Sequence, residues 1–199
     1  IPEADLKSFL IDAGANYKGY AADITRTYAY QSGEFADMIA AMDTHQLRLC
    51  EQAVVGADYV DLHVQAHRAV AQILHDFKVI TCTPDAAVES GLTQTFFPHG
   101  LGHYLGLQVH DVSGHVIDRE GTLKPPPETY PFLRLTDRLR ENAVITVEPG
   151  LYFIPMLMQE IAGHNDINWS QVDRLIPFGG IRIEDNVVVK QTDSVNLSR

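Results

Sequence analysis

The sequence predicts an α+β fold. Strand-like apolar patterns stand near the start of the chain at residues 8–14 and 21–30, helical patterns follow within residues 34–77, and two strand patterns come late at residues 143–148 and 181–189. This order of strands, helices and strands, with the elements grouped rather than alternating, is typical of α+β proteins. At 199 residues the chain suits one domain or two small ones, and its 45% hydrophobic content is enough for a sizeable core.

The charge and the cysteine content exclude several classes of function. A net charge of −11 argues against a nucleic-acid-binding surface and against binding to anionic membranes. No apolar run approaches the roughly 20 residues that span a bilayer, and no signal peptide is visible. The two cysteines, Cys50 and Cys82, match no zinc motif and are typical of reduced thiols in a cytoplasmic protein. Because the chain begins IPEADLKSFL, without Met, we expect it to be a piece of a longer protein.

The early elements follow from local patterns. The first two strands, at residues 8–14 and 21–30, are joined by Asn-Tyr-Lys-Gly and should form a hairpin. A helix is expected over residues 34–55, where apolar residues recur at helical spacing before Gly56. Asp61 can cap a second helix, whose apolar face runs to Phe77. These apolar positions are Phe35, Met38, Ile39, Met42, Leu49 and Ala53 in the first helix and Leu62, Ala66, Ala69, Val70 and Ile73 in the second.

The later elements are less regular. A short third helix is expected at residues 83–90, and strands with tight turns in the segment FFPHGLGHYLGLQVHD at residues 96–111. Residues 113–131 should form a long loop that three consecutive prolines order. Two late strands follow, AVITVE, which Pro149 and Gly150 halt, and IRIEDNVVV.

Two aspartates are predicted to meet on the hairpin. Asp12 and Asp23 are equidistant from a turn centred between Tyr17 and Lys18, so they would face each other with Cβ atoms about 5 Å apart. Like charges placed in this way repel unless a cation lies between them or one is protonated. The alternative is that both acids lie on a solvent-exposed face, although Ile11, Ala13 and Ala22 beside them indicate a partly buried setting.

Further candidate ligands lie in the late strands and in the glycine–histidine segment. Glu148 ends one apolar strand and Glu184 interrupts the other, where each could instead lie at an edge or pair with a base such as Arg182. Together with a glycine-flanked histidine, four such acids suggest a metal site. Carboxylate oxygens with one imidazole favour Mn, Mg or Co over the Cys/His surroundings of structural zinc.

Four motifs in order resemble one metallopeptidase family. IDAGANYKGYAADITRT, PHGLGHYLGLQVHD, ITVEPGLYF and GGIRIEDNVVV are similar to the catalytic domain of the family that includes methionine aminopeptidase, aminopeptidase P and prolidase. QVHDVSG, PFLRLTDRL and INWSQVDRLIPFGGIRIEDN resemble bacterial Xaa-Pro dipeptidases, or prolidases, and their organophosphorus acid anhydrolase relatives. The resemblance covers nearly the whole chain and implies a pita-bread fold, with a curved antiparallel sheet around a dinuclear metal site.

The resemblance also implies roles for individual residues. The metal ligands would be Asp12, Asp23, His103, Glu148 and Glu184, with Asp23 and Glu184 bridging two divalent ions, most simply Mn²⁺. These ions would hold a hydroxide that attacks the bond before proline, and Glu148 would shuttle the proton. His99 and His110 would stabilise the oxyanion and orient the substrate, and Arg182 would bind its carboxylate. The remaining substrate contacts are assigned to Tyr59, Val109 and Leu133.

The same resemblance sets limits on the chain. It implies that residues 1–199 are a C-terminal catalytic domain without its N-terminal domain and first elements, so apolar sheet surface should be uncovered and activity impaired. The substrate is expected to be a dipeptide ending in proline, and the intact protein a cytoplasmic homodimer. Two alternatives stay open: an ester or organophosphate hydrolase of the same fold, and a non-catalytic binding fragment.

Overall fold

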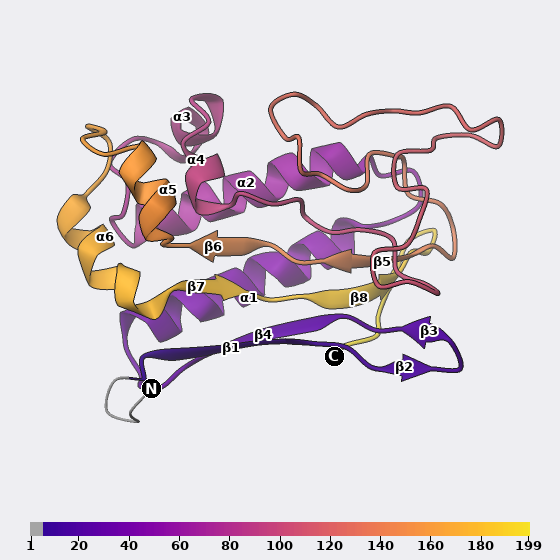
Figure 1. The fold of residues 1–199 in the computed structure, drawn as a ribbon, viewed down its shortest axis with the longest axis horizontal. Coiled ribbons are helices and arrows are strands. Elements are labelled where there is room, and N and C mark those ends of the chain that lie inside the picture. The colour runs from indigo at the N-terminus through magenta and orange to yellow at the C-terminus, as the bar shows by residue number, and fades with distance from the viewer. Residues whose placement is uncertain (1–5) are drawn as a thin grey trace.

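The computed structural model describes residues 6–199, in which an antiparallel sheet carries two long helices on one face (Figure 1). The fold class predicted from the order of the elements therefore agrees with the observed architecture. The largest fully buried side chains come from the helices, from the long connection that follows them and from the segment just after the strand Gly150–Tyr152. They include Met38, Tyr59, Phe96, Leu133 and Phe153. The core thus lies between the helices and the sheet, and the other face of the sheet is free to carry a site.

Four short strands form the N-terminal hairpin, and its register differs from the predicted one. They are β1 (Ser8–Ala13), β2 (Asn16–Tyr17), β3 (Tyr20–Ala21) and β4 (Ile24–Ala29). Lys18 and Gly19 have φ of 52° and 90°, and Tyr17 pairs with Tyr20, as in a two-residue type I′ turn. The predicted turn centre is one residue too early. Asp12 therefore pairs with Thr25, and the expected direct pairing of Asp12 with Asp23 is wrong.

The outer face of this hairpin is apolar and open. Phe9 and Tyr28 are paired across β1 and β4, and each is more than half exposed, at 54% and 57%. Ile11 is exposed on the same face of β1. This agrees with the expectation that part of the apolar sheet surface is uncovered.

The late strands break where the candidate ligands lie. β5 (Val144–Val147) pairs with β8 (Asp185–Val188), β6 (Gly150–Tyr152) pairs with β7 (Gly180–Arg182), and β9 (Val195–Asn196) extends β8. The predicted strand over residues 181–189 is thus two strands, interrupted at Ile183 and Glu184. The predicted end at Pro149 is correct for β5, but Gly150 starts the next strand instead of a turn. Glu184 bridges to Thr25, so β4 lies beside this break.

The long helices occupy the predicted segments with shifted ends. α1 (Glu34–Gln52) ends three residues before the predicted limit, and α2 (Tyr59–Asp76) begins after Asp58, whose side chain accepts a hydrogen bond from the Val60 amide. Asp58 is therefore the cap in place of Asp61, which lies in the first turn. α3 (Pro84–Glu89) has Thr83 as its cap, inside the predicted range.

The region between α4 (Thr93–Phe96) and β5 is irregular. The strands expected within residues 96–111 are absent from the described structure, apart from a single bridge between Tyr104 and Ile145. Three short helical elements, α5 (Pro155–Glu160), α6 (Trp169–Leu175) and η2 (Ile176–Phe178), follow β6 and lead back to the sheet. In the described part of the chain, we find no helix long and apolar enough to cross a membrane.

Candidate metal centre

The acidic and histidine side chains gather in one cavity of about 700 Å³ on the sheet, which we call the acidic pocket. Its wall draws on the hairpin, the glycine–histidine segment, the loop before β5 and the break between β7 and β8. The predicted site residues that line it are Asp12, Asp23, His99, His103, His110, Leu133, Glu148, Arg182 and Glu184. Elements separated by more than 150 residues in the sequence therefore supply a single pocket.

Three overlapping groups of side chains in this pocket have the spacing of metal ligands. The groups are Asp12 with Asp23 and Glu184, His103 with Glu148 and Glu184, and Asp23 with His103 and His110. Within each group the candidate ligand atoms lie within 4.8 Å of one another. All five predicted ligands are thus brought together, although the hairpin register differs. His110, which the resemblance assigns to the substrate, also lies within this spacing.

Asp12 and Asp23 converge by a diagonal relation. Thr25 pairs with Asp12, and Asp23 lies two residues before Thr25, in the gap between β3 and β4. Diagonal neighbours on one face of an antiparallel pair remain within reach of each other's side chains. The physical reason for predicting proximity was therefore sound, although the pairing was wrong.

His103 and Glu148 are positioned by backbone contacts between the glycine–histidine segment and β5. The amide of Glu148 donates to the Leu101 carbonyl and the amide of Thr146 donates to the His103 carbonyl, at 2.8 and 2.9 Å. Gly102 makes this approach possible, because a Cβ atom there would come within 2.3 Å of the Thr146 carbonyl oxygen. The glycines in this segment therefore serve close packing.

Two of the buried candidate ligand atoms have no hydrogen-bond partner among the described residues. The Nδ1 atom of His103 lies 2.9 Å from the Tyr104 carbonyl, so its N–H donates there and Nε2 is left as an acceptor. Nε2 lies 3.5 Å from a Glu148 oxygen and 3.6 Å from an Asp23 oxygen, and it has no hydrogen-bond partner. Glu184 accepts from Thr25 through Oε2 at 2.6 Å, while Oε1 has no partner. An acceptor nitrogen and a carboxylate oxygen buried in this way fit divalent cations.

Burial shifts the pKa values of the acids upward. It raises the pKa of Glu148 to about 8, and the charge of Glu184 adds to the shift. Burial also raises the pKa of Glu184 to about 7 and that of Asp23 to about 6, where the Asp12 charge contributes next. The acids therefore repel one another when ionised, and a bound cation would relieve that repulsion.

We expect the metal-free protein to lose stability between pH 6.5 and 8.5. The raised pKa values mean that the folded state holds protons which the unfolded state has already released, so stability falls as pH rises through the folded pKa values of Glu184 and Glu148. One pKa unit is about 1.4 kcal/mol, or roughly 3–6 °C in melting temperature for a chain of this size. Melting curves in a chelator should show this fall, and Glu148→Gln should flatten it.

Below pH 6.5 the buried histidines change the stability in the opposite direction, because their contribution falls as the pH falls. Burial lowers the pKa of His99 and of His103 to about 4, so the stability that depends on these neutral rings is lost as pH falls from 6.5 towards 4, against the continuing gain from protonation of the acids. A metal-free protein whose melting temperature rose from pH 6.5 to 8.5 would contradict the assignment of raised pKa values to the acids.

Asn186 holds the backbone of Asp23 and was not predicted. Its Oδ1 accepts from the Asp23 amide at 3.1 Å, and its Nδ2 donates to the Asp23 carbonyl. Asp23 lies outside the regular strands, so this side chain replaces a ladder partner. Its place two residues after Glu184 in the RIEDN motif was the only signal in the sequence.

We expect Asn186→Ala to weaken divalent-metal binding about 10–100-fold, because residues that orient ligands typically have effects of this size. Calorimetric titration with Mn²⁺ would measure the change, with Asn165→Ala, an exposed residue after α5, as the matched control. An unchanged affinity in Asn186→Ala would mean that Asp23 keeps its position without the clamp.

A second unpredicted residue, Tyr152, joins His99 to Arg182. Arg182 Nη1 donates to the Tyr152 hydroxyl at 3.3 Å, which leaves the hydroxyl hydrogen for His99 Nε2 at 2.8 Å. His99 Nδ1 then donates to the Gly100 carbonyl at 2.8 Å. Both ring nitrogens of His99 are thus engaged within the chain. The ring orientation is fixed, but a free N–H for a substrate is not presented.

Arg182 lies at the edge of the acidic pocket with donors to spare. Nε donates to Thr25 at 3.2 Å, and Nη2 forms an ion pair with Asp12. Together with the Tyr152 contact these use three of the five guanidinium N–H groups. The two that remain could bind an anionic group that enters the pocket.

Two of the residues assigned to substrate contact lie elsewhere. Tyr59 is fully buried, and its hydroxyl donates to the Thr146 carbonyl at 2.7 Å, so it supports β5 from the core side. Val109 is 43% exposed and is not part of the pocket wall. Leu133 does line the pocket. The structure therefore brings one of the three, Leu133, to the site.

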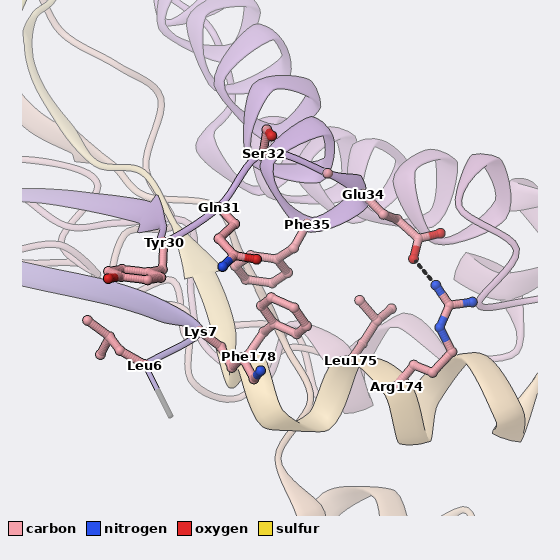
Figure 2. A pocket seen from close by; sticks show the side chains of 11 residues that line it. Leu6, Lys7, Tyr30, Gln31, Ser32, Glu34, Phe35, Arg174, Leu175 and Phe178 are labelled. Atoms are coloured by element: carbon pink, nitrogen blue, oxygen red, sulfur yellow. Dashed lines mark hydrogen bonds and ion pairs between the residues drawn. The ribbon is translucent and has the colours of Figure 1, made fainter. Parts of the chain in front are cut away.

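Another large cavity lies at the start of α1, beside α6 and η2 (Figure 2). It encloses about 650 Å³, with the rings of Phe35 and Phe178 stacked at 4.6 Å and Glu34 paired with Arg174 at 2.8 Å. None of the residues that line it belongs to the predicted site. The predicted catalytic and metal-binding residues are thus concentrated in the acidic pocket, although the two cavities are similar in size.

Comparisons with known proteins show what this chain is similar to. Residues 3–191 match the model of metallopeptidase family M24. The chain is 52% identical over 196 residues to an Xaa-Pro dipeptidase of Colwellia psychrerythraea and 53% identical over 195 residues to one of Shewanella loihica. These alignments cover 97% and 96% of this chain but 44% of each relative. The chain therefore spans less than half the length of the curated relatives it matches.

Solved structures show the same fold. A zinc-substituted Escherichia coli aminopeptidase P in complex with product matches with a TM-score of 0.71 and 30% identity, over 96% of this chain and 38% of that one. Pseudomonas aeruginosa aminopeptidase PepP matches with a TM-score of 0.72 and 24% identity over the same shares. These similarities confirm the predicted pita-bread fold.

Proposed function

The chain belongs to metallopeptidase family M24, and we propose that its acidic pocket is the active site of a metal-dependent Xaa-Pro dipeptidase. The observation that carries the proposal is the convergence of Asp12, Asp23, His103, Glu148 and Glu184, with two of their buried ligand atoms unpartnered. The relatives named Xaa-Pro dipeptidase, about half identical over nearly the whole chain, support the substrate class.

The five residues would hold two divalent ions, which we propose to be Mn²⁺. The oxygen-rich donor set with a single predicted imidazole supports this choice. Asp23 and Glu184 would serve both ions, because each belongs to two of the three ligand groups and has two carboxylate oxygens to offer. His103 also belongs to two groups, but its Nδ1 is engaged with Tyr104 and only Nε2 remains. When bound, the ions would lower the pKa of a water molecule and polarise the peptide carbonyl.

The remaining side chains would bind and orient the dipeptide. Arg182 would pair with the carboxylate of the C-terminal proline through its two remaining N–H groups. Glu148 would accept the proton from the attacking water and pass it to the leaving nitrogen, a role that its place beside His103 in the wall of the acidic pocket supports. His99 and His110 would orient the substrate, with Tyr152 fixing the His99 ring. Val109 and Tyr59 could contribute only if the loop or the core rearranged.

We also propose that residues 1–199 correspond to the C-terminal catalytic domain of a longer cytoplasmic protein that forms a homodimer. The relatives' greater length and the exposed apolar face of the hairpin support the larger size. The two cysteines, both free thiols, support a reducing compartment.

Hydrolysis of dipeptides by the Mn²⁺-loaded chain tests the proposed activity. Ala-Pro should be cleaved, whereas Ala-Ala and the tripeptide Ala-Pro-Ala should be cleaved at least about 100-fold more slowly, because only Ala-Pro carries its free carboxylate on the proline, where Arg182 would bind it. Equal rates on Ala-Pro and Ala-Ala would contradict the proposed specificity. Cleavage of a phosphotriester in preference to Ala-Pro would favour the organophosphate alternative.

A further inference from the structure

A pair of buried histidines on α2 lies outside the acidic pocket and has no role in the chemistry above. His63 and His67 are one helical turn apart, and each is 1% exposed. Their Nε2 atoms lie 3.2 Å apart, so one donates to the other, and His67 Nδ1 bonds to the Thr93 hydroxyl at 2.9 Å. The Nδ1 atom of His63 is buried and has no hydrogen-bond partner within residues 6–199.

The two rings line a separate cavity of about 330 Å³, which we call the histidine pocket. Packed aromatic rings form part of its wall: the centroid of the Tyr130 ring lies 4.6 Å from that of His63 and 4.8 Å from that of His67, and Phe97 packs against both at 5.4 and 4.8 Å. The volume is at the low end for ligand pockets, which range over about 300–1,000 Å³. The cavity thus suits one side chain or a small molecule.

The histidine pocket adjoins the acidic pocket. Five residues line both cavities: Pro98, His99, Pro131, Phe132 and Leu133. His99 stands at this boundary, with its ring against Phe97 at 4.9 Å and against Tyr152 at 5.4 Å. A molecule held in the acidic pocket could therefore extend a side chain into the histidine pocket past this shared wall.

The histidine pocket is unfavourable for a charged ligand group. Burial lowers the pKa of His63 to about 2 and that of His67 to about 4, so both rings are neutral at neutral pH. Glu160 is the one acidic residue in the wall, and it is exposed. Neither histidine belongs to a metal-ligand group found among the described residues. An ion would be poorly solvated in such surroundings, whereas an uncharged ring would stack on the aromatic wall.

We propose that the histidine pocket is a binding subsite for an uncharged aromatic or large apolar group. The group would come from the side chain of a peptide held in the acidic pocket or from a free small molecule of the same chemistry. The first source rests on the proposed peptidase function, and the second does not.

Nuclear magnetic resonance of the histidine rings in the metal-free chain tests the subsite without any activity. N-acetyl-phenylalaninamide should shift the imidazole signals of His63 and His67 in a saturable way, and N-acetyl-glycinamide, which lacks the ring, should not. Thr95→Phe, in the wall of the pocket, should abolish the shift, while Thr192→Phe, at an exposed position near the C-terminus, should preserve it. No shift in the unaltered chain, or a shift that survives Thr95→Phe, would overturn the proposal. Circular dichroism and melting curves would show that both variants fold.

Dipeptide cleavage by the Mn²⁺-loaded chain then distinguishes the two sources. If a substrate side chain occupies the pocket, Thr95→Phe should lower kcat/KM for Phe-Pro at least about tenfold and leave Gly-Pro within about twofold. If both dipeptides are cleaved as before while the ring shift is lost, the occupant is a free ligand. If the unaltered chain cleaves neither dipeptide, the peptidase proposal fails, and the ring signals still decide whether the subsite exists.

Discussion

Replacing Asp23 by Asn is expected to weaken the binding of both metal ions severely. Asp23 belongs to two of the three ligand groups in the acidic pocket, one with Asp12 and Glu184 and one with His103 and His110. The amide keeps the shape of the side chain but not its charge, and it is a poor ligand for a hard cation. Calorimetric titration with Mn²⁺ should show two sites in the unaltered chain and an affinity at least about 100-fold lower at each in Asp23→Asn.

The melting temperature of Asp23→Asn shows whether the variant has lost only a metal ligand or has failed to fold. Burial and the Asp12 charge raise the pKa of Asp23 to about 6, so ionised Asp23 destabilises the metal-free fold at pH 8. Asp23→Asn should therefore melt no lower than the unaltered chain in a chelator, yet gain nothing when Mn²⁺ is added. The unaltered chain should gain about 2.7 kcal/mol at a metal concentration 100 times Kd.

The control is Asp173→Asn, an exposed carboxylate on α6, which should bind metal as the unaltered chain does. Two metal sites of unchanged affinity in Asp23→Asn would mean that Asp23 is not a ligand shared by the two metal ions. Failure of the unaltered chain to bind Mn²⁺ would mean that the convergence of the five side chains does not make a metal site in this chain.

The N-terminal hairpin illustrates how far sequence reasoning reached and why it stopped. The pattern identified both strands and the meeting of Asp12 with Asp23, but the register was wrong by one residue at the turn. Lys18 is a non-glycine residue with φ of 52°, which a pattern of residue types does not reveal. The acids still meet, because diagonal neighbours on a twisted pair approach closely enough for their side chains to share a site.

The late strands were predicted better than the glycine–histidine segment, because a local signal marked the break in the strand whereas distant contacts set the path of the segment. Glu184 was singled out because it interrupts an apolar run, and the structure breaks the strand at that residue to bring it to Thr25. Residues 96–111, by contrast, were expected to form strands, but backbone contacts with β5 hold them in an irregular path. Such contacts depend on a partner about 40 residues away and leave no local periodicity.

Residues that act through other residues were missed altogether. Asn186 and Tyr152 act by holding Asp23 and His99, which requires knowledge of three-dimensional neighbours. His63 and His67 had a visible signal, a spacing of four residues beside the apolar face of a helix, but this spacing also fits a packed core. The candidate ligands were found because their chemistry is unusual for strands, whereas the supporting residues are ordinary in composition.

Replacing Glu148 by Gln is expected to separate metal binding from catalysis. The side chain lies beside His103 Nε2 at 3.5 Å and accepts a hydrogen bond from Thr146 at 3.4 Å, so glutamine can occupy the same space. Its amide cannot take up and release a proton. At saturating Mn²⁺, kcat for Ala-Pro should therefore fall about 10²–10⁴-fold, the usual contribution of a general acid–base group.

The metal requirement of this variant provides the discriminating measurement. If Glu148 served only as a ligand, raising the Mn²⁺ concentration until both sites fill would restore kcat, whereas a missing proton carrier cannot be replaced by metal. Glu141→Gln, an exposed glutamate before β5, should keep its activity at every metal concentration. Activity of Glu148→Gln within tenfold of the unaltered chain at saturating metal would assign the proton transfer to another group.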